Sequence, residues 1–169
     1  MRNTELGDAS KAESLYDFSA YNIEGKLVSL AKYREKVVVI VNVATKCIHA
    51  ERHFKEFTDL VKKYKMKGLC ILAFPCDQFG TQQDMVEEMK ELVKDDRPFD
   101  FFAPIDVNGS SAHPLWQWLK KKTPTVGVNF IKWNFTKFIV DKNGHPAERL
   151  PPNTNPSEME TNLLRVFKN

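Results

Sequence analysis

The chain has 169 residues, which at roughly 150 residues per domain predicts a single folded domain. Hydrophobic residues make up 42% and charged residues 28%, close to the averages of soluble globular proteins, so disorder, collagen and coiled coil are excluded. Lysine and arginine number 25 and acidic residues 22, which gives a net charge of +3. This excess permits contact with anionic headgroups or acidic small molecules. We expect no nucleic-acid partner, because that requires a dense basic surface.

The beginning of the chain predicts a flexible N-terminal tail over residues 1–14, followed by a single domain over 15–169. The tail lacks hydrophobic periodicity, and its acidic residues are unlike the apolar core of a secretory signal. The longest apolar run, 37–41, is far shorter than the roughly 20 residues of a membrane-spanning helix. We therefore expect a cytoplasmic protein, in which three cysteines are too few for a disulfide framework.

The first half of the domain predicts a hairpin and then two buried strands joined by a helix. Residues 15–28 place a glycine-containing turn between short apolar segments, which indicates the hairpin. The run 37–43 is β-branched and apolar on both parities, as is typical of a central strand. Helical spacing begins at Glu51 and ends in lysines before Gly68, and 69–74 is the second buried strand.

The second half predicts two more helices, a short strand, a hairpin and a final helix. The expected ranges are a helix over 85–93, a strand over 103–107, a helix over 112–119, a strand over 135–140 and a turn over 141–144. Asn155-Pro156-Ser157-Glu158 has the capping pattern that opens a last helix. This order predicts an α/β domain with a thioredoxin-like fold, in which helices cover both faces of a central mixed sheet.

Three segments that are distant in sequence are expected to meet at the carboxyl edge of the parallel strands. Cys47 follows the first strand, Gln82 lies at the end of the loop after the second, and Trp133-Asn134 precedes the strand at 135–140. Gln82, Trp133 and Asn134 offer neutral N–H donors, which stabilise a thiolate and the charge that develops on oxygen. Their joint placement with Cys47 indicates a redox site.

Cys47 is the candidate nucleophile. It precedes a helix, where unpaired backbone N–H groups and the adjacent Lys46 stabilise a thiolate, although a buried structural cysteine is the equal alternative on position alone. Ala50 occupies the position of the second cysteine of a dithiol oxidoreductase, which disfavours thioredoxin chemistry. Cys70 is expected in the core. For Cys76 we favour a structural role over a role as the disulfide partner of Cys47.

His49 and His53 are spaced one helical turn apart close to Cys47. The segment lacks the His-Glu-x-x-His order and a further ligand, so we expect two solvated histidines on a helix face and no metal site.

Four segments are similar to the signatures of a known enzyme family. They read VNVATKC at 41–47, ILAFPCDQFG at 71–80, IDVNG at 105–109 and IKWNFTKF at 131–138. In their order and spacing they resemble the glutathione peroxidase family from about Leu15 to Phe167. The resemblance implies a thioredoxin fold and a catalytic tetrad at Cys47, Gln82, Trp133 and Asn134.

The resemblance also implies the reaction. A thiol peroxidase of this kind reduces lipid and organic hydroperoxides, and hydrogen peroxide, to alcohols or water through a sulfenic acid on Cys47. Glutathione is the expected electron donor and co-substrate, with no bound cofactor. Members that depend on thioredoxin carry a resolving cysteine that would fall near Leu92, and none is present there. The segment 119–130 is short, which is similar to the monomeric phospholipid-hydroperoxide type.

Two lysines are candidate substrate-binding residues. Lys46 and Lys132 flank the expected site and suit phosphate headgroups or the carboxylates of glutathione, which includes transient contact with a membrane surface. The run 120–122 is either a further basic contact or a solvated face.

Departures from the family pattern leave two alternative functions open. Ile48-His49-Ala50 replaces the usual glycine after the nucleophile, Gln83-Asp84-Met85 replaces Glu-Pro-Gly, and Asp77 stands where asparagine is common. The alternatives are a thioredoxin-dependent peroxidase that resolves through Cys76, and a redox sensor or interaction protein that is oxidised once without turnover.

Overall fold

The computed structural model describes residues 5–80, 84–94, 98–123 and 129–169. Its strands are β1 (Ser19–Tyr21), β2 (Leu27–Ser29), β3 (Val37–Val43), β4 (Leu69–Pro75), β5 (Asp100–Phe101), β6 (Lys137–Val140) and β7 (Pro146–Leu150). Its α-helices are α1 (Ala50–Tyr64), α2 (Met85–Lys94), α3 (Pro114–Lys122) and α4 (Glu160–Phe167). Among the described residues, no helix is both long and apolar enough to cross a membrane.

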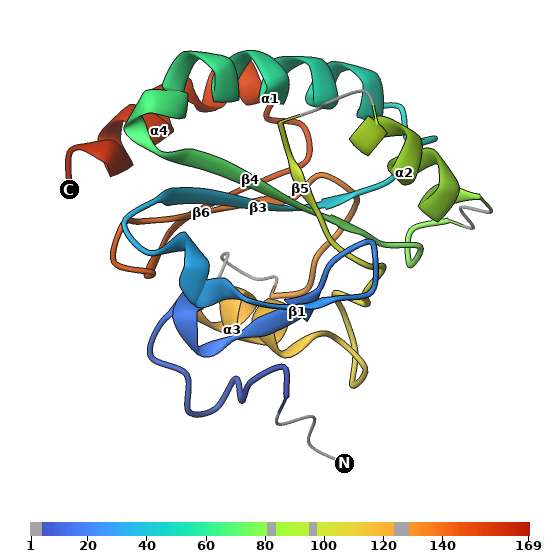
Figure 1. The fold of residues 1–169 in the computed structure, drawn as a ribbon, viewed down its shortest axis with the longest axis horizontal. Helices are drawn as coiled ribbons and strands as arrows, with labels where there is room; N and C mark the ends of the chain where they lie inside the picture. Colours follow the sequence, from blue (N-terminus) through green and yellow to red (C-terminus); the bar gives the residue numbers. More distant parts are fainter. Residues whose placement is uncertain (1–4, 81–83, 95–97, 124–128) are drawn as a thin grey trace.

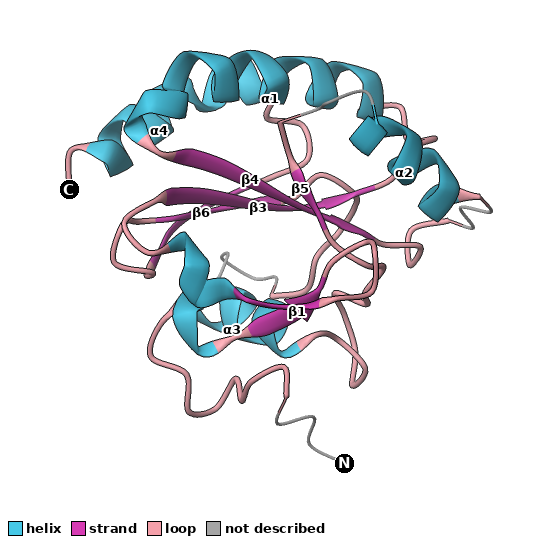
Figure 2. Cartoon of the chain, viewed as in Figure 1, coloured by secondary structure: helices cyan, strands magenta, loops and turns pink. Residues whose placement is uncertain are grey.

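β3 lies at the centre of a five-stranded mixed sheet with the order β5-β4-β3-β6-β7. It pairs in parallel with β4, where Val41 lies opposite Ala73, and antiparallel with β6, where Val41 lies opposite Lys137. All seven residues of β3 are buried, which confirms the central strand predicted from the apolar run. Because β6 runs antiparallel to β3, the amino end of β6 lies at the carboxyl end of β3 (Figure 2).

Helices cover both faces of the sheet, as the order of elements predicts (Figure 1). α1, α2 and α4 lie on one face, here called the α1 face, and pack around residues such as Phe57, Met89 and Leu163. α3 and the β1–β2 hairpin lie on the other, here called the α3 face, whose core includes Leu30 and Trp116. Alternate residues of β3 and β4 supply the two cores, as the pleat of a strand requires.

The N-terminal segment, expected as a flexible tail over 1–14, packs against the domain over its described part. The Ser19 amide donates to the Leu6 carbonyl (3.1 Å), and the Tyr21 hydroxyl donates to Glu5 (2.7 Å). Gly7 has a φ of 111°, and a Cβ there would meet Phe18 at 2.8 Å, so only glycine fits this close approach. Residues 5–14 therefore contact the α3 face, although each of them keeps some exposure to solvent and the first fully buried side chain is that of Leu15.

The short strand predicted at 103–107 is wrong. The strand that pairs with β4 is the preceding β5, and residues 103–107 follow it without regular secondary structure. In this segment the Ala103 amide donates to the Tyr21 carbonyl and the Ile105 amide donates to the Pro75 carbonyl. Pro104 between them has no N–H to donate, so a continuous ladder cannot form.

Candidate active site

Cys47 lies in the connection between β3 and α1, at the carboxyl edge of the sheet. Its carbonyl accepts a hydrogen bond from the amide of Ala50, the first residue of α1 (3.0 Å). The side chain is partly exposed and packs against the α1-face core. The next residue, Ile48, is 91% exposed, so the departure from the usual glycine places an apolar side chain in solvent beside the thiol.

The segment that contains Trp133 and Asn134 is held against the end of β3 by Asn42. The Asn42 side chain donates to the Trp133 carbonyl (3.1 Å) and accepts from the Thr136 amide (3.0 Å). The Asn42 carbonyl accepts from the Phe135 amide (2.6 Å). Asn42 is fully buried and lies five residues before Cys47 in the chain. The predicted convergence of these two segments is therefore confirmed.

Trp133 and Asn134 differ in exposure. Trp133 is 44% exposed, and its ring packs against that of Phe79, with 5.7 Å between the ring centroids. Asn134 is 2% exposed, and its Oδ1 atom is buried with no hydrogen-bond partner among the described residues. Phe135 lies in the left-handed region of backbone conformations, with a φ of 66°. β6 therefore begins at Lys137, two residues after the predicted start of this strand.

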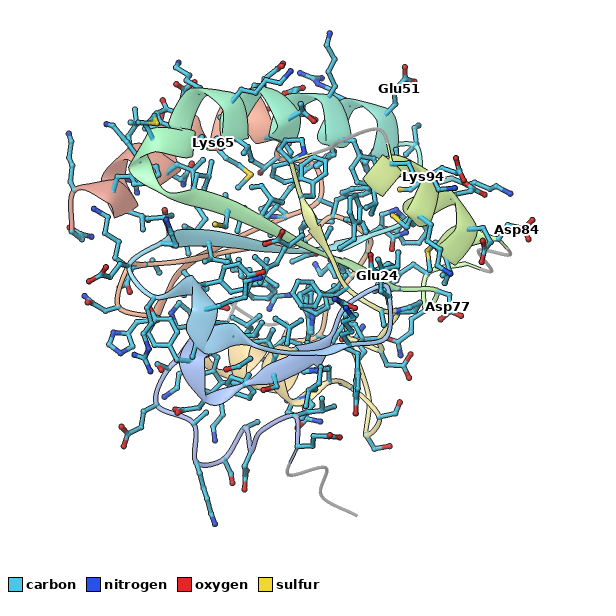
Figure 3. All side chains as sticks on the ribbon, in the orientation of Figure 1. Glu24, Glu51, Lys65, Asp77, Asp84 and Lys94 are labelled. Atoms are coloured by element: carbon cyan, nitrogen blue, oxygen red, sulfur yellow. The ribbon has the colours of Figure 1, made fainter. Side chains whose placement is uncertain are left out.

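Gln82, the fourth candidate, lies outside the described residues. The described residues on either side of it include Asp77 and Asp84, both exposed and labelled in Figure 3. The loop after β4 begins beside the end of β3, where the Cys76 amide donates to the Val43 carbonyl (3.1 Å).

Cys76 lies on the α3 face, whereas Cys47 packs against the α1 face. The Cys76 side chain is 1% exposed, and burial raises the pKa of its thiol to about 11. Cys70, six residues earlier on β4, is partly buried against the same α3-face core, and burial also raises the pKa of its thiol. The structure therefore favours the structural role that we expected for both residues.

The expectation of two solvated histidines is wrong for His53. Its side chain is fully buried, its Nδ1 lies 2.8 Å from the His49 carbonyl oxygen, and its ring packs against Phe135 with 4.6 Å between centroids. Burial, followed by the charge of Lys137, lowers the pKa of His53 to about 4. The sequence does indicate this burial, because His53 lies four residues before Phe57 and therefore on the same apolar side of the helix. No group of three or more metal-ligating side chains occurs among the described residues.

Lys137, which the sequence analysis did not single out, is fully buried at the start of β6. Its ammonium donates to the carbonyls of Pro151 (3.1 Å), Pro152 (3.2 Å) and Thr154. Burial lowers its pKa to about 7, while Glu158 and Glu56 act in the opposite direction. Three carbonyl acceptors and two nearby carboxylates thus offset the loss of hydration of this cation.

The candidate substrate-binding lysines differ in their surroundings. Lys46 forms an ion pair with Glu88 of α2 (3.4 Å), whereas Lys132 is exposed immediately before Trp133. Lys120 of the basic run turns inward, where it donates to the carbonyl of Val107, and burial lowers its pKa. Lys120 is therefore part of the domain's internal bonding rather than of a basic face.

Comparison with known proteins shows the family of this chain. The model of the glutathione peroxidase family matches residues 15–120. The chain is 41% identical over 161 residues to a probable phospholipid hydroperoxide glutathione peroxidase of Solanum lycopersicum, covering 94% of this chain and 95% of that protein. It is 44% identical to the phospholipid hydroperoxide glutathione peroxidase of Sapajus apella, covering 92% of this chain and 81% of that protein.

Solved structures agree with these relatives. The crystal structure of T. cruzi GPX1 superposes with a TM-score of 0.76 at 34% identity, covering 93% of this chain and 98% of that chain. A thiol:disulfide interchange protein of the thioredoxin family from Chlorobium tepidum superposes with a TM-score of 0.63 at 14% identity, covering 89% and 92%. The second likeness shows the fold alone, and it confirms the predicted thioredoxin-like architecture.

Proposed function

The chain belongs to the glutathione peroxidase family, and we propose that it reduces phospholipid and other organic hydroperoxides, and hydrogen peroxide, with glutathione as electron donor. The observation that carries the proposal is the position of Cys47. Its partly exposed thiol follows β3 at the edge where Asn42 also holds the Trp133-Asn134 segment. The fold alone does not identify a nucleophile, and this partly exposed position supports Cys47 in that role.

In the oxidative step, the Cys47 thiolate attacks the terminal oxygen of the hydroperoxide. An S–O bond forms, the O–O bond breaks, and the leaving oxygen takes a proton to become an alcohol, or water when the substrate is hydrogen peroxide. Cys47 becomes a sulfenic acid. We assign N–H donation to the reacting atoms to Trp133, Asn134 and Gln82, because neutral donors stabilise negative charge on oxygen without titrating.

In the reductive steps, glutathione restores the thiol. One glutathione attacks the sulfenic sulfur, which releases water and leaves a mixed disulfide on Cys47. A second glutathione attacks the glutathione sulfur of that disulfide, which forms glutathione disulfide and frees the Cys47 thiol. No bound cofactor is needed in this proposal, because both electrons come from the two thiols.

Two observations support an external thiol as reductant. α2 contains no cysteine, and Cys76 is buried on the opposite face of the sheet from the core that Cys47 contacts. For Cys76 to resolve the sulfenic acid, its thiol would have to leave the α3-face core and reach Cys47 on the other side of the sheet. The thioredoxin-dependent alternative is correspondingly disfavoured.

The proposal extends to the setting of the enzyme. All three cysteines are free thiols, which suits the reducing environment of the cytoplasm. The short segment after α3 supports a monomer. Lys46 and the exposed Lys132 are proposed contacts for phosphate headgroups or glutathione carboxylates, which would bring the site to a membrane surface transiently.

The deciding experiment is steady-state consumption of a phospholipid hydroperoxide with glutathione, and separately with a thioredoxin system. We expect turnover with glutathione that is lost in Cys47→Ser and retained in Cys70→Ser, the matched control on the other face. Turnover that survives in Cys47→Ser would overturn the proposal. A single stoichiometric round of peroxide loss without turnover would favour the redox sensor instead.

A further inference from the structure

Two amide side chains outside the proposed tetrad connect the loop after β4 to the segment that leads into Trp133. Gln78 belongs to this loop. Its Oε1 accepts from the amides of Val107 (2.7 Å) and Asn108 (3.0 Å), and its Nε2 donates to the Asn108 carbonyl (3.1 Å). One side chain thus satisfies three backbone groups about 30 positions away in the sequence.

Asn108 continues the connection. Its Oδ1 accepts from the amide of Ile131 (2.8 Å), and its Nδ2 donates to the carbonyl of Ile131 (2.7 Å). Ile131 is fully buried, and both its N–H and its C=O group are bonded to this one side chain, in the way that a neighbouring strand would bond them. Ile131 lies two residues before Trp133. Lys120 adds a longer contact to Asn108 Oδ1 (3.4 Å).

The same loop also contacts Trp133 directly. Phe79, which follows Gln78, packs its ring against the Trp133 ring, while the Trp133 carbonyl accepts a hydrogen bond from Asn42. The indole is nevertheless 44% exposed, so few packing contacts restrain it. Hydrogen bonds to the backbone just before Trp133 are then a main determinant of where the indole N–H lies.

We propose that Gln78 and Asn108 form an amide clamp that positions Trp133 for the peroxidase reaction. The inference rests on the proposed function, since it assigns the two amides a role in that reaction. They are positioning residues, because their polar atoms bond to backbone groups and act on the site through Ile131 and Phe79.

The first test is Asn108→Ala. We expect the second-order rate constant for oxidation of reduced Cys47 by a hydroperoxide to fall about tenfold, since small misplacements at a site are costly in rate. Asn108→Asp keeps the acceptor for the Ile131 amide but sets a carboxylate oxygen against the Ile131 carbonyl in place of the donor, so a fall is expected here as well. Asn162→Ala is the matched control, because that amide bonds to Glu148 on β7 and should leave the rate unchanged.

A double-mutant cycle separates positioning from general loosening of the structure. In a Trp133→Phe background, the Asn108→Ala change should cost less than about twofold, because the group that it positions is already gone. An equal loss in both backgrounds would overturn the proposal. If Asn108→Ala does not fold, the cycle is carried out with Asn108→Asp.

Fluorescence provides a readout independent of peroxidase activity. Trp116 and Trp118 are 0% and 1% exposed, so acrylamide quenching reports on Trp133. We expect stronger quenching in the clamp variants than in wild type and Asn162→Ala. Unchanged quenching in folded Asn108→Ala would overturn the clamp. A wild-type chain without peroxidase activity would instead overturn the proposed function, and the quenching comparison would still decide whether the clamp holds Trp133.

Discussion

Cys47 and Cys76 follow neighbouring parallel strands at the same edge of the sheet, yet their surroundings differ. Cys76 comes directly after β4 and continues its even-numbered residues, which face α3, so its thiol is part of that core. Cys47 comes four residues after β3 ends, where the chain has left the pleat, and its thiol is partly exposed on the α1 side. Location at the carboxyl edge therefore does not by itself make a cysteine reactive. The direction in which the chain leaves the strand decides whether solvent and substrate reach the sulfur.

The largest expected difference between the two thiols is in alkylation. At pH 8 a thiol whose pKa is about 11 is only about 0.1% thiolate, and Cys76 is also shielded by burial. We expect iodoacetamide to modify Cys47 at least about a thousandfold faster than Cys76 in the native protein, as followed by mass spectrometry. In denaturant the two rates should converge. Similar alkylation rates of Cys47 and Cys76 in the native protein would contradict the difference in accessibility between the two thiols.

Each face of the sheet contains a buried histidine that makes the fold sensitive to acid, and on the α1 face it is His53. The pKa of His53 in the fold is about 4, below its ordinary value, so between pH 6.5 and 4 the unfolded chain binds a proton that the folded chain does not. Stability is therefore lost as pH falls through this window, by about 2 kcal/mol at pH 5. Urea unfolding at pH 7 and pH 5 should show a smaller loss in His53→Phe than in wild type.

The matched control for this prediction is His145→Gln, an exposed histidine, which should keep the wild-type pH dependence. His113 on the α3 face also has a pKa lowered to about 4 by burial, so part of the acid loss should persist in His53→Phe. A variant with the full wild-type loss would show that His53 is not neutral in the fold.

A smaller effect is expected from Cys76→Ala. The change removes a buried sulfur from the α3-face core, and we expect a loss of about 1 kcal/mol in the free energy of unfolding. Glutathione-dependent peroxidase activity should remain within about twofold of wild type, because Cys76 has no part in the proposed chemistry. Loss of turnover in a folded Cys76→Ala variant would restore the resolving role that the structure disfavours.

The smallest effect is expected at the ion pair between Lys46 and Glu88. Lys46 is 59% exposed in its side chain, and exposed pairs contribute little, so Glu88→Gln should change the free energy of unfolding by less than about 0.5 kcal/mol. If Lys46 contacts anionic substrate, the same variant should lower KM for glutathione, because the Glu88 carboxylate no longer competes for the lysine. An unchanged KM at low salt would argue against that contact.

Local patterns predicted most of the fold, because its main elements bury regular apolar stripes. The β-branched run predicted the bounds of β3, and the stripe containing Phe57 and Leu60 predicted the start of α1 to within a residue. The α-helix ends at Tyr64, before the last predicted lysines, which form a short 3-10 turn. The predicted strand at 103–107 failed because pairing with β4, rather than local propensity, selects β5.

The site was predictable where it depends on topology, and less so where it depends on burial. Antiparallel β6 was enough to bring Trp133 and Asn134 to the end of β3. The burial of Lys137 depends on carbonyls of residues 151–154, and the bonds of Gln78 depend on residues about 30 positions away. Such long-range polar contacts leave no periodic trace in the sequence.

The bonds between Asn42 and the Trp133 segment also bear on synthesis of the chain. These two residues are 91 positions apart, and at about 5–20 residues per second a ribosome needs about 5–18 s to pass from one to the other. During that interval β3, Cys47 and the neighbouring strand β4 are made, whereas β6, the neighbour of β3 on its other side, has not been made. A nascent chain paused before Trp133 therefore carries the nucleophile without the segment proposed to assist it, and the last third of translation completes the site.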